Sequence, residues 1–182
     1  MDERTLQTPR LELRPTSPEV FDELWAASSA SLSEVAPWMA WAVDHKPEDA
    51  RSFVAGSQQS WASGTAYNFT IFESGVACGN CSLNRVDSLT RSGEIGYWLR
   101  TDLCGRGLMT EAASAVVDFG FDEVRLHRIE LHAGVDNAAS IRVAEKLGFR
   151  REGIMRGRGL GAGGHYDMYL YGLLEDDDRP RL

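Results

Sequence analysis

The feature that most constrains the fold is a strand-like run that leads through a glycine turn into a helical run. Residues 94–99 form the strand-like run, Gly105 and Gly107 follow it, and helical apolar spacing begins at Leu108. The first turn of a helix exposes unpaired backbone N–H groups and carries partial positive charge, which suits a pyrophosphate. Glycines let the backbone approach such an anion closely. The unit therefore predicts an anion-binding turn, although many such turns only make a tight bend.

A second glycine pattern, Gly159-x-Gly161-x-x-Gly164, matches the dinucleotide-binding fingerprint in letters only. That fingerprint requires a helix directly after the glycines, and here the strand-like residues 165–173 follow instead. We therefore expect a flexible hairpin loop, which could act as a lid over a substrate.

Hydrophobic spacing divides the rest of the chain into further helices and strands. Helical runs begin at Pro18 and Pro47, extend over about residues 108–124, and begin again at Asn137. The glycine at position 64 can end the second of these helices. Strand-like runs cover residues 10–14, 67–72, 76–86, 93–99, 128–135, 149–156 and 165–173. The order βααβββαβαββ predicts an α+β fold with helices on both faces of one sheet.

Composition limits the classes of protein to which the chain can belong. With 182 residues, 43% apolar and 25% charged, it suits one globular domain over residues 1–182. Without a bilayer-spanning stretch or an apolar signal core, we expect a cytoplasmic protein with no membrane partner. The net charge of −8 argues against a nucleic-acid partner. The acidic end, about residues 175–182, is expected to be a frayed tail.

Three cysteines are a low, odd count that fits a reducing compartment. Cys78 and Cys81 form a CxxC pattern, but they fall in a strand-like run, where residues three apart point to opposite faces. A structural zinc site also needs four ligands, and no second pair has suitable spacing. We therefore predict no metal site.

Four ordered segments together resemble the GNAT N-acetyltransferase superfamily, and more narrowly its Rim-type ribosomal-protein N-terminal acetyltransferases. The opening residues 8–14 and the segment with Trp38 and Trp41 fit as well, so the resemblance covers nearly the whole chain. The four segments are Gly93-Glu-Ile-Gly-Tyr-Trp-Leu99, Gly105-Arg-Gly-Leu-Met-Thr-Glu-Ala112, Val135-Asp-Asn-Ala-Ala-Ser140 and Glu145-Lys-Leu-Gly-Phe149.

The resemblance implies a mixed, mostly antiparallel sheet that binds acetyl-CoA as a co-substrate. The strand ending at Leu99 would diverge from residues 128–135 in a V-shaped splay, which would receive the pantetheine arm. Asp102 departs from the family pattern, which often has glutamine or arginine there, and we expect its side chain to turn outward from the diphosphate. The cofactor-binding residues that the resemblance implies are Leu99, Thr101, Gly105, Arg106, Gly107, Leu108, Met109, Thr110, Asn137 and Lys146.

Acetyl transfer to an amine needs a base, an oxyanion donor and a proton for the leaving thiolate. Glu94 is the candidate base, acting through water, and a plain surface carboxylate is the alternative. Backbone N–H groups near Leu99 would hold the oxyanion. The resemblance implies Ser140 as the acid to the CoA sulfur, with Tyr166 and His165 as alternative proton carriers. The tryptophans at 38, 41 and 61 are candidates for the acceptor side, although core packing explains at least one of them.

These features predict an N-acetyltransferase that moves an acetyl group to a primary amine by direct transfer in a ternary complex. By resemblance, the acceptor is the N-terminal α-amine of a protein such as a ribosomal protein. A first rival is a small-molecule acetyltransferase acting on a polyamine, drug or amino-acid derivative, which a closed aromatic pocket would favour. A second rival is a non-catalytic CoA-binding module. The oligomeric state, including a homodimer, stays open.

Overall fold

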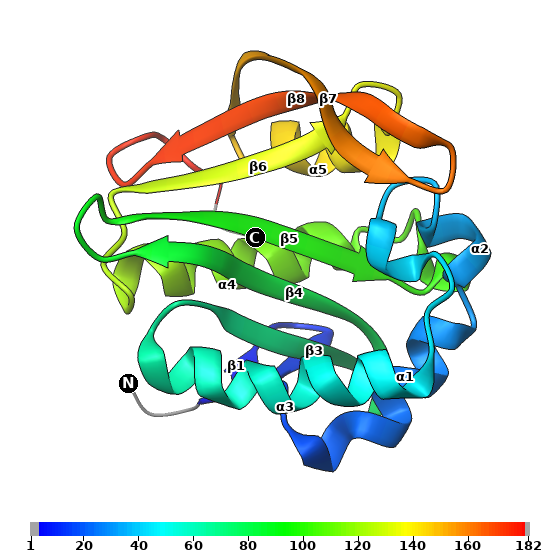
Figure 1. Cartoon of the computed structure of the whole chain (residues 1–182). Helices are drawn as coiled ribbons and strands as arrows, with labels where there is room; N and C mark the ends of the chain where they lie inside the picture. Colours follow the sequence, from blue (N-terminus) through cyan, green and yellow to red (C-terminus); the bar gives the residue numbers. More distant parts are fainter. Residues whose placement is uncertain (1–3, 181–182) are drawn as a thin grey trace.

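The computed structural model describes residues 4–180, in which one eight-stranded sheet carries helices on both faces (Figure 1). The strands are β1 (Leu6–Gln7), β2 (Leu11–Pro15), β3 (Tyr67–Glu73), β4 (Val76–Asp87), β5 (Ser92–Leu99), β6 (Arg128–Gly134), β7 (Arg150–Gly161) and β8 (Gly164–Leu174). The helices are α1 (Phe21–Ser29), α2 (Leu32–Val35), α3 (Pro47–Ser63), α4 (Leu108–Asp122) and α5 (Ala138–Lys146). Short 3₁₀ turns cover Pro18–Val20, Ala40–Ala42 and Thr101–Leu103.

The strand order in the sheet is β1-β2-β3-β4-β5-β6-β8-β7, and β5 and β6 are its one parallel pair within the described chain. They pair only from Ser92 opposite Arg128 to Ile95 opposite Leu131. Beyond that point β5 stays paired with β4, while β6 stays paired with β8. The predicted α+β fold and its V-shaped splay are therefore confirmed (Figure 1).

The core lies mainly between the sheet and α4. Alternation along β3 buries Phe69 and Ile71 completely on one face. On α4, the predicted face of Leu108, Ala112, Val116 and Phe119 is buried as well. This packing holds the start of α4 against the sheet, next to the end of β5.

Several helix ends follow the sequence signals. Gly64 ends α3 in the left-handed conformation, with φ +71°. Asn137 caps α5, because its Oδ1 accepts a hydrogen bond from the backbone N–H of Ser140. The sequence missed the short elements β1 and α2, and Pro18 begins only a 3₁₀ turn that leads into α1.

The glycine-rich segment 159–164 forms the tip of the β7–β8 hairpin, as expected, but most of it is strand and not loop. Strand β7 runs to Gly161, and the backbone N–H of Ala162 donates a hydrogen bond to the carbonyl of Ala36 over 2.8 Å. A Cβ atom on Gly161 would lie 2.1 Å from the carbonyl oxygen of Pro37. The glycine is needed because two backbones approach closely there. The hairpin tip is thereby fixed to the segment after α2.

The two cysteines of the CxxC pattern lie in the same apolar cluster, so the prediction of opposite faces is wrong. The register of β3 and β4 shifts so that Cys78 is an extra residue in β4, and such a bulge reverses the alternation. Burial raises the pKa of Cys78 to about 11. Within residues 4–180, no three or more His, Cys, Asp or Glu side chains are grouped so that they could hold a metal ion.

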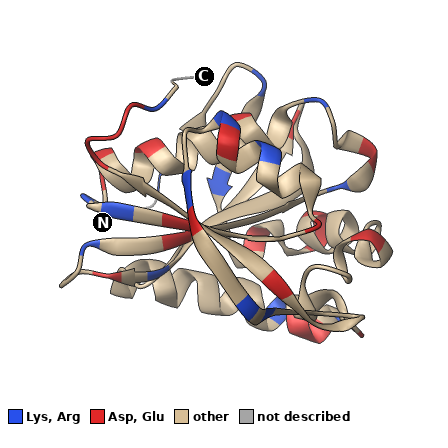
Figure 2. Cartoon of the chain, turned by 90° about the horizontal axis from the view of Figure 1, so that it is seen from above, with Lys and Arg blue, Asp and Glu red and all other residues tan. Residues whose placement is uncertain are grey.

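The acidic segment before the C-terminus (red in Figure 2), expected to be frayed, makes ion pairs as far as it is described. Glu175 binds Arg91 over 2.7 Å, and Asp177 binds Arg150 over 2.7 Å. Arg179 in turn binds Asp118 over 3.2 Å. Residues 181–182 of the predicted tail lie outside the described residues. No helix among the described residues is long and apolar enough to cross a membrane.

The packing of the hairpin tip predicts that Gly161→Ala destabilises the protein. Because the new Cβ would meet the backbone of Pro37, we expect the free energy of unfolding to fall by about 1–3 kcal/mol. Gly163→Ala is the matched control, since a Cβ there meets nothing within 4 Å. Urea unfolding of the three proteins is the measurement. Equal loss of stability in both variants would contradict the close approach.

Candidate active site

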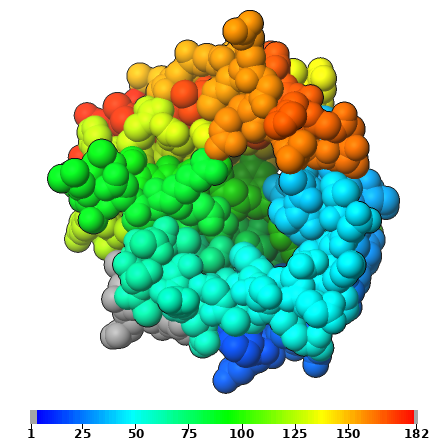
Figure 3. Space-filling view, viewed as in Figure 1, coloured from blue at the N-terminus to red at the C-terminus, as the bar shows by residue number. Residues whose placement is uncertain are grey.

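One cavity of about 870 Å³ reaches into the splay between β5 and β6. Figure 3 shows the hollow, with β4 and β5 in green, α3 and the segment before it in cyan to blue, and the β7–β8 hairpin in orange. Its lining includes Glu94, Tyr97 and Ser140. The structure therefore brings both predicted catalytic residues to the same cavity.

Glu94 projects from β5 into this cavity among positively charged groups. Its Oε2 lies 2.9 Å from Arg85 Nη1, and its Oε1 lies 3.3 Å from His132 Nδ1. Burial raises the pKa of Glu94, but the hydrogen bond and charge of His132 and the charges of Arg85 and Arg158 outweigh it. The resulting pKa lies below the usual value of a glutamate. Glu94 is thus ionised at neutral pH, and by itself it is a weak base.

His132 was missed by the sequence analysis. Its Nε2 lies 3.4 Å from Glu130 Oε2, so the ring stands between two carboxylates. Glu94 and Glu130 are direct partners on β5 and β6, and His132 is two residues further along the same face. The sequence could have indicated that His132 lies on the face of its strand opposite the buried Leu131. The sequence alone did not show that β5 and β6 are neighbours.

Ser140 lies in the first turn of α5, and its hydroxyl contacts Tyr97. The Tyr97 Oη and Ser140 Oγ atoms are 3.0 Å apart. Burial raises the pKa of Tyr97 far above its usual value, although the hydrogen bond with Ser140 lowers it. Tyr97 therefore keeps its proton and can donate it to the serine oxygen. The sequence analysis missed Tyr97, because the alternation of β5 shows only that it shares a face with the buried Ile95.

The glycine turn lies beyond the far end of β5 and leads into α4. Gly105 and Gly107 have φ of +79° and +78°, which side chains other than glycine rarely adopt. Gly107 is the N-cap, and α4 begins at Leu108. The side chains of Leu108, Met109 and Thr110 are buried, so these residues offer a ligand their backbone N–H groups alone.

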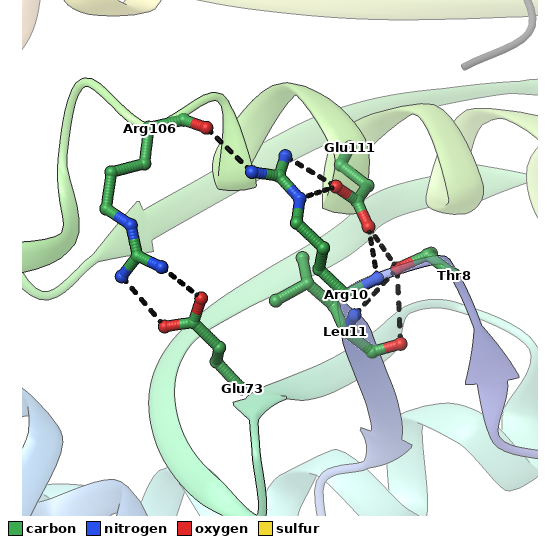
Figure 4. A network of polar contacts seen from close by, with 6 residues as sticks. All are labelled: Thr8, Arg10, Leu11, Glu73, Arg106 and Glu111. Carbon is green, nitrogen blue, oxygen red and sulfur yellow. Dashed lines mark hydrogen bonds and ion pairs between the residues drawn. The ribbon is translucent and has the colours of Figure 1, made fainter.

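Arg106, the cation predicted beside the turn, is already paired with Glu73 (Figure 4). Its two Nη atoms lie 2.9 and 2.6 Å from that carboxylate. The carbonyl of Arg106 accepts a hydrogen bond from Arg10 Nη1, and Arg10 also binds Glu111 in the first turn of α4. The turn is thus clamped by the N-terminal segment, and the Arg106 charge is matched within the protein.

The other residues proposed for the cofactor have varied surroundings. The backbone N–H of Thr101 donates a hydrogen bond to Ser31 Oγ over 3.1 Å, and Leu99 is paired with Gly79 of β4. Asp102 binds Arg100 with both carboxylate oxygens and its side chain is 60% exposed, in line with the expected outward direction. Asn137 lines the cavity, and Lys146 is exposed at the end of α5.

The aromatic residues divide between the cavity and the core. Trp38 and Trp41 line the cavity, whereas Trp61 is buried against Tyr67 and other core rings. Tyr166 also lines the cavity, and its hydroxyl donates a hydrogen bond to the carbonyl of Trp38 over 2.5 Å. The hydroxyl of Tyr166 is therefore occupied, and together with Trp38 its ring forms one wall.

Comparison with known proteins gives consistent matches. The family model described as "Acetyltransferase (GNAT) domain" matches residues 10–150. The putative ribosomal N-acetyltransferase YdaF of Bacillus subtilis is 37% identical over 101 residues, which span 56% of this chain and 55% of that protein. The ribosomal-protein-serine acetyltransferase of Escherichia coli is 32% identical over 71% of this chain and 72% of its own length. The solved structure of Mycobacterium smegmatis RimJ in complex with CoA-disulfide has a TM-score of 0.84 at 27% identity, covering 94% and 86% of the two chains.

The clamp on the glycine turn predicts a pH-dependent loss of stability in Glu111→Gln. Burial raises the pKa of Glu111, but hydrogen bonds from Thr8 and Arg10 and the Arg10 charge lower it more. A carboxylate with a lowered folded-state pKa stabilises the protein above its unfolded-state pKa, and this stabilisation is lost as the pH falls through the folded-state value. We expect the variant to lose about 1–3 kcal/mol at pH 7.

Urea unfolding at pH 7 and at successively lower pH below about 4.5 measures this effect. The difference between the wild type and Glu111→Gln should shrink as the pH falls. Glu48→Gln, in the first turn of α3, is the matched control and should lose less than about 1 kcal/mol at pH 7, the usual contribution of a carboxylate at a helix N-terminus. A difference that stays constant with pH would contradict the role given to the Glu111 charge.

Proposed function

The chain belongs to the GNAT acetyltransferase family, and we propose that it acetylates the N-terminal α-amine of a protein, with a ribosomal protein as the first candidate. It is an N-acetyltransferase with acetyl-CoA as its co-substrate. The observation that carries the proposal is that Glu94 and Ser140 line the same cavity at the splay of β5 and β6.

The pantetheine arm lies in the splay, where β5 beyond Ile95 has lost its β6 partner. An added strand can pair with backbone groups of β5 on that edge, up to about Leu99 and Thr101. Asn137 keeps its side-chain N–H₂ group for the same arm, because its Oδ1 caps α5. The pyrophosphate lies on the backbone from Gly105 to Thr110, and Lys146 reaches the ribose phosphate. Because Glu73 already pairs with Arg106, the backbone N–H groups supply most of the binding there.

The acceptor amine arrives protonated, because a free α-amine has a pKa near 8. Glu94 receives that proton through a water molecule, and the neutral nitrogen then attacks the thioester carbon. Backbone N–H groups near Leu99 hold the oxyanion. Ser140 donates its proton to the sulfur as the carbon–sulfur bond breaks and regains a proton from water in the cavity, while the Tyr97 hydroxyl keeps its own proton and stabilises the serine oxygen by a hydrogen bond. The thioester supplies an activated acetyl group, so no covalent enzyme intermediate is needed.

A protein acceptor is supported by the E. coli relative, whose substrate is a serine of a ribosomal protein, and by the hollow that reaches the surface in Figure 3. The test is a screen with acetyl-CoA and thiol detection against ribosomal N-terminal peptides, spermidine and amino-acid amides. We expect peptides to give the highest kcat/KM. Preference for spermidine or an amide would establish the small-molecule rival instead. CoA binding without thiol release for any acceptor would favour the other alternative, a non-catalytic CoA-binding module.

The contact between Tyr97 and Ser140 predicts the kinetics of Ser140→Ala. The variant should lower kcat by roughly tenfold to a thousandfold, with a much smaller change in the KM for acetyl-CoA, because the proton is donated only in the transition state. Tyr97→Phe should lower kcat less. If Tyr97 acts through Ser140, the double variant should be no slower than Ser140→Ala. Full kcat in Ser140→Ala would contradict the role of the serine as proton donor and leave it only a place in the first turn of α5.

A further inference from the structure

Arg158 is an exposed arginine of β7 that lines the cavity beside Glu94. Its side chain makes no ion pair or hydrogen bond to any other residue in the stretch 4–180. Its charge nevertheless acts on the site, because it contributes to the lowered pKa of Glu94. The proposed reaction gives this guanidinium group no role, although it faces the position of the acceptor.

A β-bulge directs Arg158 into the cavity. Met155 pairs with Met168 and Gly159 pairs with Tyr166, so three residues of β7, 156–158, stand opposite one residue of β8. Bulges commonly redirect side chains next to binding sites.

The bulge is held in place by its own contacts. Asp167 Oδ1 accepts a hydrogen bond from the backbone N–H of Gly157 over 2.7 Å, and His165 Nδ1 lies 3.1 Å from the Gly157 carbonyl oxygen. Gly157 has φ +61°, a conformation that favours glycine. Since none of these contacts uses the Arg158 side chain, the bulge is independent of it, and the guanidinium is free to bind a ligand.

The charges around Glu94 show which ligand the guanidinium would bind. Arg85 already pairs with Glu94 over 2.9 Å, and His132 Nδ1 lies 3.3 Å from the same carboxylate. Asp49, the other carboxylate in the lining, accepts a hydrogen bond from the Lys46 backbone. Arg158 is therefore a positive charge without a matching carboxylate next to the amine site. This arrangement disfavours a polycationic acceptor and favours one with an anion close to its amine.

We propose that Arg158 binds a carboxylate of the acceptor, so that the preferred acceptors are peptides with an acidic residue close behind the N-terminal amine. The inference rests on the proposed function and specifies its substrate class. The amine lies at Glu94, and the acidic side chain pairs with the fork of donors on the guanidinium, which matches a carboxylate.

The test compares two peptides that differ only in Asp or Asn at the second position behind an N-terminal serine. The wild type should have a higher kcat/KM for the Asp peptide. Arg158→Gln should lower the ratio of kcat/KM for the Asp peptide to kcat/KM for the Asn peptide by roughly tenfold to a hundredfold, because any effect of the lost charge on Glu94 is common to both peptides. Arg158→Glu should reverse the preference between Asp and Lys at that position. Arg156→Gln is the matched control, since it removes the same charge from the same bulge without lining the cavity.

Three results would overturn the inference in different ways. Equal kcat/KM for the Asp and Asn peptides in wild type and Arg158→Gln would overturn the role of Arg158 alone and leave the proposed function standing. Weaker CoA binding by Arg158→Gln in calorimetry would assign the arginine to the donor side. Acetylation of neither peptide, while spermidine or an amide is acetylated, would overturn the proposed acceptor and this inference with it.

Discussion

The site depends on the short parallel pairing of β5 with β6. Their hydrogen bonds stop after Ile95 and Leu131, because each strand is held from its other side, β5 by β4 and β6 by β8. Backbone groups on the inner edge of β5 are then left without a strand partner. Since buried backbone groups need hydrogen bonds, an amide-containing arm that entered the splay, as we propose for pantetheine, would satisfy them. The same divergence opens the cavity between Glu94 on one strand and Ser140 beyond the other.

Two sets of contacts far apart in sequence give the splay its boundaries. At the glycine turn, Arg10 binds both Glu111 and the carbonyl of Arg106, so the N-terminal segment fixes the turn (Figure 4). At the β7–β8 hairpin, Ala162 and Tyr166 bind the segment that carries Ala36 and Trp38. The first set fixes the backbone of the glycine turn, and the second places aromatic rings along the opposite wall of the cavity.

Much of this could be predicted from local pattern. The glycine turn, the helix from Leu108, the Asn137 cap and the run of strands all follow from spacing along the chain, and the resemblance supplied the splay. Errors arose where packing overrides spacing: the bulge at Cys78 changes its face, and Gly161 serves a backbone contact with Pro37. Three cavity residues to which the sequence analysis gave no role are Tyr97, His132 and Arg158, and their surroundings depend on neighbours from other parts of the sheet. The local spacing of apolar residues does not specify which strands are neighbours in the sheet or where a bulge occurs.

The most direct test of the account is backbone amide hydrogen exchange with and without CoA. If the arm pairs with the free edge of β5 and the pyrophosphate lies on the start of α4, amides between Gly96 and Leu99 and from Gly107 to Thr110 should exchange more slowly with CoA bound. Amides in β1 and β2, which no pairing joins to β5, should be unchanged. Unchanged exchange in both segments, with protection elsewhere, would show that the splay is not the donor site.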